Sequence, residues 1–137
     1  MRHRQMVGGV VLALVLAPGV PMSGHHGADT FATGTQITLK GTVTEWIWAN
    51  PHCFLRFDAK DDTGTVRNWV AETQNPVSMT ARGLSRSMVK AGDPVTVTIE
   101  PAKNGEPVAR LLTVTLPDGR TLVAANPQPA APAPSPQ

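Results

Sequence analysis

Apolar and polar residues alternate in five segments of this chain, and turn-forming residues separate the segments. In the first segment, which begins at Gln36, Ile37, Leu39 and Val43 share one parity and threonines hold most of the other. A period of two places such side chains on opposite faces of a β-strand, one buried and one wet. We expect the other strands near residues 53–59, 66–73, 95–99 and 112–116, with a last short extended segment at 120–123.

One short helix interrupts the predicted strands. Asn75 is a good N-cap, Pro76 suits the first helical position, and Gly83 suits the left-handed position after the last turn. Three strands, a helix and two strands are typical of the oligonucleotide/oligosaccharide-binding (OB) type of barrel. The predicted fold is all-β with one short helix, a small five-stranded OB-like, partly open β-barrel. An open sandwich of the same strands is the alternative.

The first predicted strand changes character along its length. Gly41 in mid-strand indicates a bend or a bulge, which a long strand needs where a small barrel curls. Further on, Glu45 takes the apolar parity while Trp46 and Trp48 take the other. We infer that the two faces of this strand exchange near Glu45.

The two ends of the chain differ in composition from its centre. The first residues carry two arginines, an apolar run of about eleven residues and then small residues, the pattern of a secretory signal peptide. A membrane-spanning helix needs about 20 apolar residues, so no stable membrane insertion is expected after signal cleavage. The expected order is a signal peptide at 1–24, a flexible histidine-containing segment at 25–35, the OB-like barrel at 36–123 and a disordered Pro/Ala-rich tail at 124–137. The protein is expected to be periplasmic or secreted.

Export changes how the net charge is interpreted. The chain has 12 basic and 10 acidic side chains, and Arg2 and Arg4 belong to the predicted signal peptide, so the mature chain is close to neutral. Positive charge supplies most nucleic-acid affinity. We therefore expect no nucleic-acid partner.

The segment WIWANPHCF, residues 46–54, combines two tryptophans, an Asn-Pro step, a histidine and the only cysteine. Pro51 restricts Asn50 to extended conformations, so the pair predicts a corner between the first two strands. His52 would stand at the barrel rim, either as a ligand or as a hydrogen-bond partner of the turn. Cys53 has no second cysteine to pair with, and is either buried, which we favour, or a reactive or metal-binding thiol. The candidate ligand-binding residues are Trp46, Asn50 and His52.

Four aromatic rings have a parity that would place them on the outer face of the second and third strands: Trp46, Trp48, Phe54 and Trp69. OB-type barrels bind linear ligands on this face, and flat rings suit sugars and peptides. The alternative is that large rings close the end of a small core. We favour the core for Trp48 and Trp69 and leave Trp46 open.

The three histidines of the mature chain fall in two places, His25 and His26 beside the predicted cleavage site and His52 at the rim. Cleavage after Gly24 would let the amine and imidazole of His25 chelate one metal, with His52 as a third nitrogen ligand. Cleavage slightly earlier would give a chelate of amine, amides and imidazole. Both donor sets are rich in nitrogen and favour Cu(II), so copper is the cofactor they indicate. The alternative is that His25 and His26 are simply a polar start of the mature chain.

No catalytic constellation is visible in the sequence. The acidic residues Glu45, Asp58 and Glu72 lie on predicted strands with nothing that places two of them together. The serines of residues 78–87 have no histidine nearby in the sequence. We expect a protein without catalytic residues that is not an enzyme.

Six motifs follow one another along the chain: HHGADTFA, GTVTEWIWANPH, NWVAE, ARGLSRSMVKAGDPVTV, PAKNG and TLPDGRTL. In order and spacing, from His25 to Leu122, they resemble the small exported bacterial proteins of the DUF6152 family. The resemblance implies an exported small β-domain with no assigned function. This chain has Gly27 where the family typically has serine after the histidine pair.

Two functions are compatible with these observations. The first is an exported small β-barrel that binds a ligand at its rim, in its most specific form a Cu(II)-like metal held by His25, His26 and His52. The alternative is a structural or interaction module of the cell envelope that binds a protein or polymer through an aromatic face.

Overall fold

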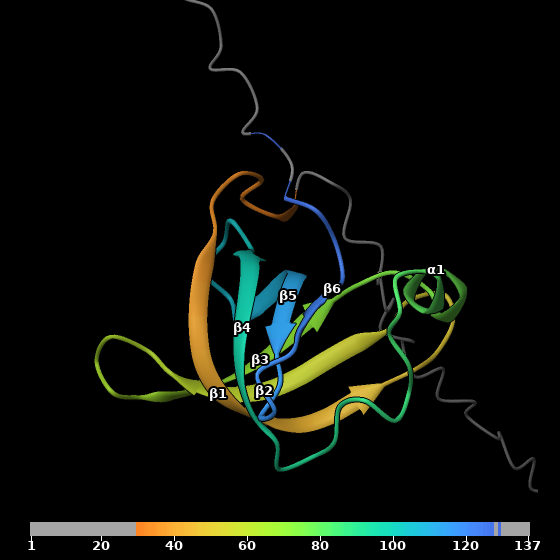
Figure 1. The fold of residues 1–137 in the computed structure, drawn as a ribbon. Helices are drawn as coiled ribbons and strands as arrows, with labels where there is room; N and C mark the ends of the chain where they lie inside the picture. Colours follow the sequence, from red (N-terminus) through yellow and green to blue (C-terminus); the bar gives the residue numbers. More distant parts are fainter. Residues whose placement is uncertain (1–29, 128, 130–137) are drawn as a thin grey trace, which may run out of the picture.

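A computed structural model describes residues 30–127 and residue 129 of the chain. Strands and helix follow in the predicted order (Figure 1). They are β1 (Ile37–Ile47), β2 (Phe54–Lys60), β3 (Val66–Glu72), α1 (Pro76–Ala81), β4 (Pro94–Pro101), β5 (Val108–Thr115) and β6 (Thr121–Val123). The predicted signal peptide, residues 25–29 and most of the predicted tail lie outside the described residues.

Five strands close into a ring. β1 pairs antiparallel with β2 and β4, β2 with β3, and β4 with β5. A short parallel pairing of β3 with β5, from Val70 opposite Val108 to Glu72 opposite Arg110, completes the ring, and β6 extends β5 outside it. The protein is a mostly β, closed five-stranded mixed barrel with one extra strand and one short helix. The predicted five-stranded OB-like barrel is confirmed, except that it is closed and not partly open, because β3 pairs with β5.

A β-bulge in β1 exchanges the faces of that strand. Its pairing with β2 shifts between Val43 and Glu45, so Thr44 is the extra residue. Val43 therefore faces the core, Glu45 is exposed, and Trp46 lies opposite the buried Leu55. The exchange inferred near Glu45 is confirmed.

Gly41 is not the site of the bulge that its position suggested. It pairs regularly with Ala59, and a β-carbon at this position would collide with the carbonyl oxygen of Asp58 on β2. Glycine therefore allows β1 and β2 to approach. The predicted bulge lies at Thr44 instead.

A second irregularity leaves Leu112 outside the regular pairing of β4 with β5. Thr98 pairs with Thr113 but Ile99 with Leu111, which leaves Leu112 as the extra residue of β5. Leu111 packs in the main core, while the carbonyl of Leu112 accepts hydrogen bonds from the chain that follows β6. The β6 end of the chain is thereby held against β5.

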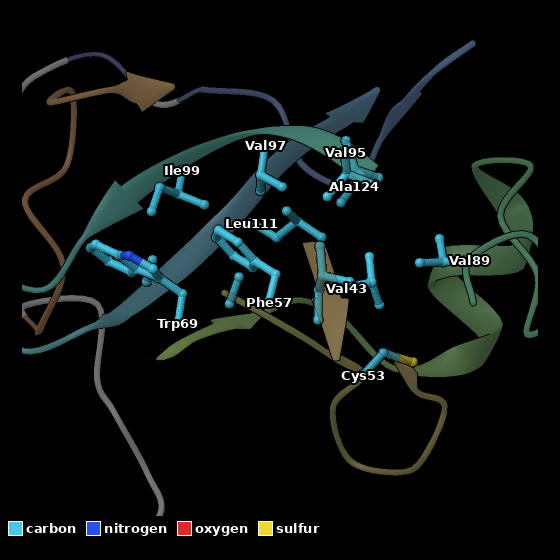
Figure 2. Close-up of a cluster of buried hydrophobic side chains, with 14 of the residues drawn as sticks. Val43, Cys53, Phe57, Trp69, Val89, Val95, Val97, Ile99, Leu111 and Ala124 are labelled. Carbon is cyan, nitrogen blue, oxygen red and sulfur yellow. The ribbon is translucent and has the colours of Figure 1, made fainter. Parts of the chain in front are cut away.

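The core fills the barrel along its length. The rings of Phe57 and Trp69 stack with their centroids 6.3 Å apart. Figure 2 shows Trp69 at one end of the buried cluster and Cys53 and Val89 at the other. Trp69 is thus a core residue, as favoured from the sequence, and Trp48 packs against the same cluster.

Helix α1 begins and ends as the sequence predicts. The side chain of Asn75 accepts a hydrogen bond of 2.9 Å from the backbone N–H of Ser78, and Gly83 adopts a φ of 82°. The helix lies at the end of the barrel where β1 ends and β2 begins, with Met79 fully buried (Figure 1). Within the described part of the chain, no helix has the length and apolar character to cross a bilayer.

Candidate functional site

The predicted corner joins β1 to β2 and is followed by strand-like pairing. Asn50 is exposed, and its peptide bond to Pro51 is cis. Cys53 then exchanges two backbone hydrogen bonds of 2.9 Å, one donated to the carbonyl of Gln74 and one accepted from the N–H of Thr73. Because successive side chains of an extended chain point to opposite faces, Cys53 faces the core and His52 faces outward.

The imidazole of His52 is oriented by a backbone carbonyl. Nδ1 of His52 lies 2.9 Å from the carbonyl oxygen of Thr73. A carbonyl only accepts, so Nδ1 carries the hydrogen and donates it, and Nε2 of the neutral ring keeps a lone pair. The His52 side chain is 41% exposed. His52 therefore offers an oriented nitrogen acceptor at the barrel rim.

A carboxylate lies beside the same ring nitrogen. Oε1 of Glu72 is 3.3 Å from Nδ1 of His52, and the Glu72 side chain is only 15% exposed. Phe54 lies opposite Glu72 in the β2–β3 ladder, and its ring meets the imidazole edge-on with centroids 6.5 Å apart. Partial burial reduces screening by water, so the carboxylate acts more strongly on His52 than an exposed one would.

Glu72 begins a line of charged residues across the outer face of the barrel, which we term the ion row: Glu72 on β3, Arg110 on β5 and Glu100 on β4. Glu100 is fully buried, and its Oε2 accepts a hydrogen bond of 2.8 Å from Nε of Arg110. Nη2 of Arg110 lies 2.5 Å from the same oxygen. The row holds two carboxylates and one guanidinium, so it carries a net negative charge.

The N-terminal arm, residues 30–36, covers the end of β4 beside the ion row. The backbone N–H of Gly34 donates to Oε1 of Glu100 at 3.1 Å. Ala32 donates its N–H to the carbonyl of Pro101 at 2.8 Å, and Lys103 donates to the carbonyl of Thr30 at 3.0 Å. These bonds fix the point at which the chain preceding Thr30 joins the barrel.

The tryptophans of the corner hold the segment between α1 and β4. The indole N–H of Trp46 donates to the carbonyl of Ser85 at 3.3 Å, and Arg86 donates to the carbonyl of Trp48 at 3.2 Å. The two rings lie 5.7 Å apart between centroids and pack, partly buried, against the core. Of the four aromatic rings whose sequence parity would place them on the outer face, only Phe54 lies there, beside His52.

Cys53 is fully buried, with its Sγ 3.9 Å from the carbonyl oxygen of Ala49. Burial raises the pKa of the Cys53 thiol because the thiolate would lose its hydration. The structural role favoured from the sequence is confirmed.

The three predicted metal ligands are not all described. Within residues 30–127, no three His, Cys, Asp or Glu side chains cluster closely enough to hold a metal ion. His25 and His26 lie outside the described residues, which leaves His52 as the predicted ligand whose geometry is known.

Glu72 is the site residue that the sequence reasoning missed, although a signal for it existed. A hairpin with Lys60 opposite Val66 places Phe54 opposite Glu72, and therefore brings Glu72 near His52. Arg110 and Glu100 had no comparable signal, because their place beside Glu72 depends on the parallel closure of the ring.

Fold and site together define a small closed β-barrel of OB-like strand order with a histidine–carboxylate pair at its rim. The chain belongs to the family of unknown function DUF6152, which matches residues 13–110, more than half of its length. The family resemblance of the sequence motifs is thereby confirmed. No curated protein and no solved structure matches this chain.

Proposed function

We propose that this protein is an exported, non-enzymatic binding protein whose ligand site lies at the barrel rim around His52. The observation that carries the proposal is the 41% exposed imidazole of His52, whose Nδ1 lies 2.9 Å from the carbonyl of Thr73, so that Nε2 is the nitrogen left for a ligand. Proteins commonly hold metal-binding imidazoles in this way, with the second nitrogen donating to a carbonyl or carboxylate. Asn50, exposed two residues before His52, adds a polar group on the same corner.

In its most specific form, the proposal is a Cu(II) site formed by His25, His26 and His52. Nitrogen-rich donor sets favour Cu(II) over the other first-row divalent ions. The ion row adds support, since its excess carboxylate charge favours a cation beside His52.

The N-terminal histidines must reach His52 from Thr30, where the N-terminal arm meets Lys103. Along the sheet, the path from Thr30 to His52 crosses β4, β5 and β3. His25 lies five residues before Thr30, so the proposed site requires this part of the chain to reach the rim at His52.

Isothermal titration of the signal-cleaved protein with Cu(II) tests this proposal. We expect the triple variant His25→Ala/His26→Ala/His52→Ala to lose binding, and His52→Ala alone to bind at least about tenfold more weakly, because each removes nitrogen donors. The mass and N-terminal residue of the mature protein identify which amine is available. Equal weak binding by wild type and triple variant would contradict the metal site and favour the alternative, a module that binds an envelope protein or polymer.

A further inference from the structure

We propose that Glu72 is the positioning residue of the rim site, which holds His52 so that Nε2 is the atom offered to the ligand. This inference rests on the proposed function. It starts from the largely buried carboxylate of Glu72, whose Oε1 lies 3.3 Å from Nδ1 of His52. The carbonyl of Thr73 is the second acceptor beside the same nitrogen, at 2.9 Å.

The two acceptors have different effects on the imidazole. The carbonyl of Thr73 sets the direction of the Nδ1–H bond, and the negative charge of Glu72 favours a hydrogen on Nδ1 over one on Nε2. The same charge stabilises the positive charge that develops on the ring when Nε2 donates its lone pair to a cation. Glu72 thus raises the affinity of Nε2 for a cation without contacting that cation.

Glu72 can take this role because the neighbouring guanidinium is already paired. Arg110 lies between Glu72 and Glu100 in the ion row. Its Nε and Nη2 both lie against Oε2 of Glu100, at 2.8 and 2.5 Å. Because Glu100 is fully buried, it has no water to replace Arg110, so the guanidinium stays with Glu100. The carboxylate of Glu72 is therefore available to interact with the imidazole of His52.

The two carboxylates are less exposed than the groups they accompany. Glu100 is 0% exposed beside Arg110 at 23%, and Glu72 is 15% exposed beside His52 at 41%. The carboxylate that serves His52 is therefore shielded from solvent, while the ring it orients is open to a ligand.

The test compares Glu72→Gln with Glu45→Gln in the complete signal-cleaved protein. Glu45 is also on the outer face, is 52% exposed and pairs with Arg56 at 3.2 Å, so its variant removes the same charge away from His52. Side-chain ¹⁵N NMR of the metal-free proteins in alkaline buffer reports which ring nitrogen of the imidazole carries the hydrogen. We expect Nδ1–H in wild type and Glu45→Gln, and a larger share of Nε2–H in Glu72→Gln.

Cu(II) titration of the same three proteins supplies a second readout. We expect Glu72→Gln to bind about 10–100-fold more weakly than wild type, with Glu45→Gln unchanged. Unchanged ring protonation and unchanged Cu(II) affinity in Glu72→Gln would overturn the positioning role while leaving the metal site intact. A change of ring protonation in a protein whose wild type binds no Cu(II) would support the positioning role and overturn the proposed metal.

Discussion

At the scale of single residues, His52 and Cys53 are neighbours in the chain with opposite environments. The backbone hydrogen bonds of Cys53 with residues 73 and 74 keep the chain extended, so one side chain is open to solvent and the next is fully buried. The thiol is thereby removed from the chemistry of the rim. The imidazole is the group of this pair that a ligand can reach.

Burial of Cys53 predicts slow reaction with a thiol reagent in the folded protein. Because burial raises the pKa of the thiol, less thiolate is present at a given pH, and the sulfur is also inaccessible. At pH about 8 we expect alkylation to be at least about tenfold slower than in denaturant, because the reagent reaches the sulfur only when the chain opens locally. Mass spectrometry follows the reaction. Equal rates in folded and denatured protein would contradict the buried structural role.

At the scale of elements, the turn of the β2–β3 hairpin depends on one carboxylate. Asp61 accepts hydrogen bonds from the Thr63 hydroxyl at 2.6 Å, the Thr63 N–H at 2.9 Å and the Thr65 N–H at 3.0 Å. These bonds, the hydroxyl bond first, lower the pKa of Asp61 below its ordinary value. The hairpin they close sets the register that brings Glu72 opposite Phe54.

The lowered pKa of Asp61 gives its contribution to stability a defined pH dependence. The folded state favours the ionised carboxylate, so the stabilisation is complete above the ordinary pKa of aspartate and is lost as pH falls through the lowered value. We expect Asp61→Ala to lower the melting temperature at neutral pH and to match wild type in strong acid. Asp62→Ala, at an exposed neighbour, is the control for the change of charge. The same loss in Asp61→Ala at both pH values would refute this account.

At the scale of the whole molecule, the N-terminal arm, the ring closure and the rim site meet in the ion row. Gly34 of the arm and Arg110 of the closing strand both donate to Glu100, and Glu72 on the other closing strand lies beside His52. The buried carboxylate of Glu100 has lost its hydration, so its burial is favourable only while Gly34 and Arg110 remain bonded to it. The row therefore places the buried Glu100–Arg110 pair in strand register with Glu72, which lies beside His52 at the rim.

Removal of Arg110 is expected to destabilise the fold strongly. Arg110→Ala would leave the charge of Glu100 buried and unpaired, with an expected loss of about 3–5 kcal/mol in the free energy of unfolding. Arg56→Ala is the matched control, because its ion pair with Glu45 is exposed on both sides and is worth about 0–1 kcal/mol. Urea unfolding of both variants measures the difference. A loss of similar size in the two variants would show that Glu100 does not depend on Arg110.

Local rules in the sequence were enough to determine the elements. The alternation of residues 37–43 and 95–99 predicted β1 and β4, the capping residues Asn75 and Gly83 predicted α1, and the parity of His52 and Cys53 predicted their opposite faces. Each of these depends on side chains within a few residues of one another, where backbone geometry leaves few alternatives. The order of the elements then indicated the type of barrel.

Only the tertiary structure decided which distant strands meet and where the ladders shift. The parallel pairing of β3 with β5, the bulges at Thr44 and Leu112 and the burial of Glu100 depend on the closure of the whole ring. Ring closure depends on the packing of all five strands around a shared core, and a one-residue shift of register moves every side chain to the other face. For that reason the sequence by itself singled out His52 as a candidate, and the fold was needed to place Glu72 and the ion row beside it.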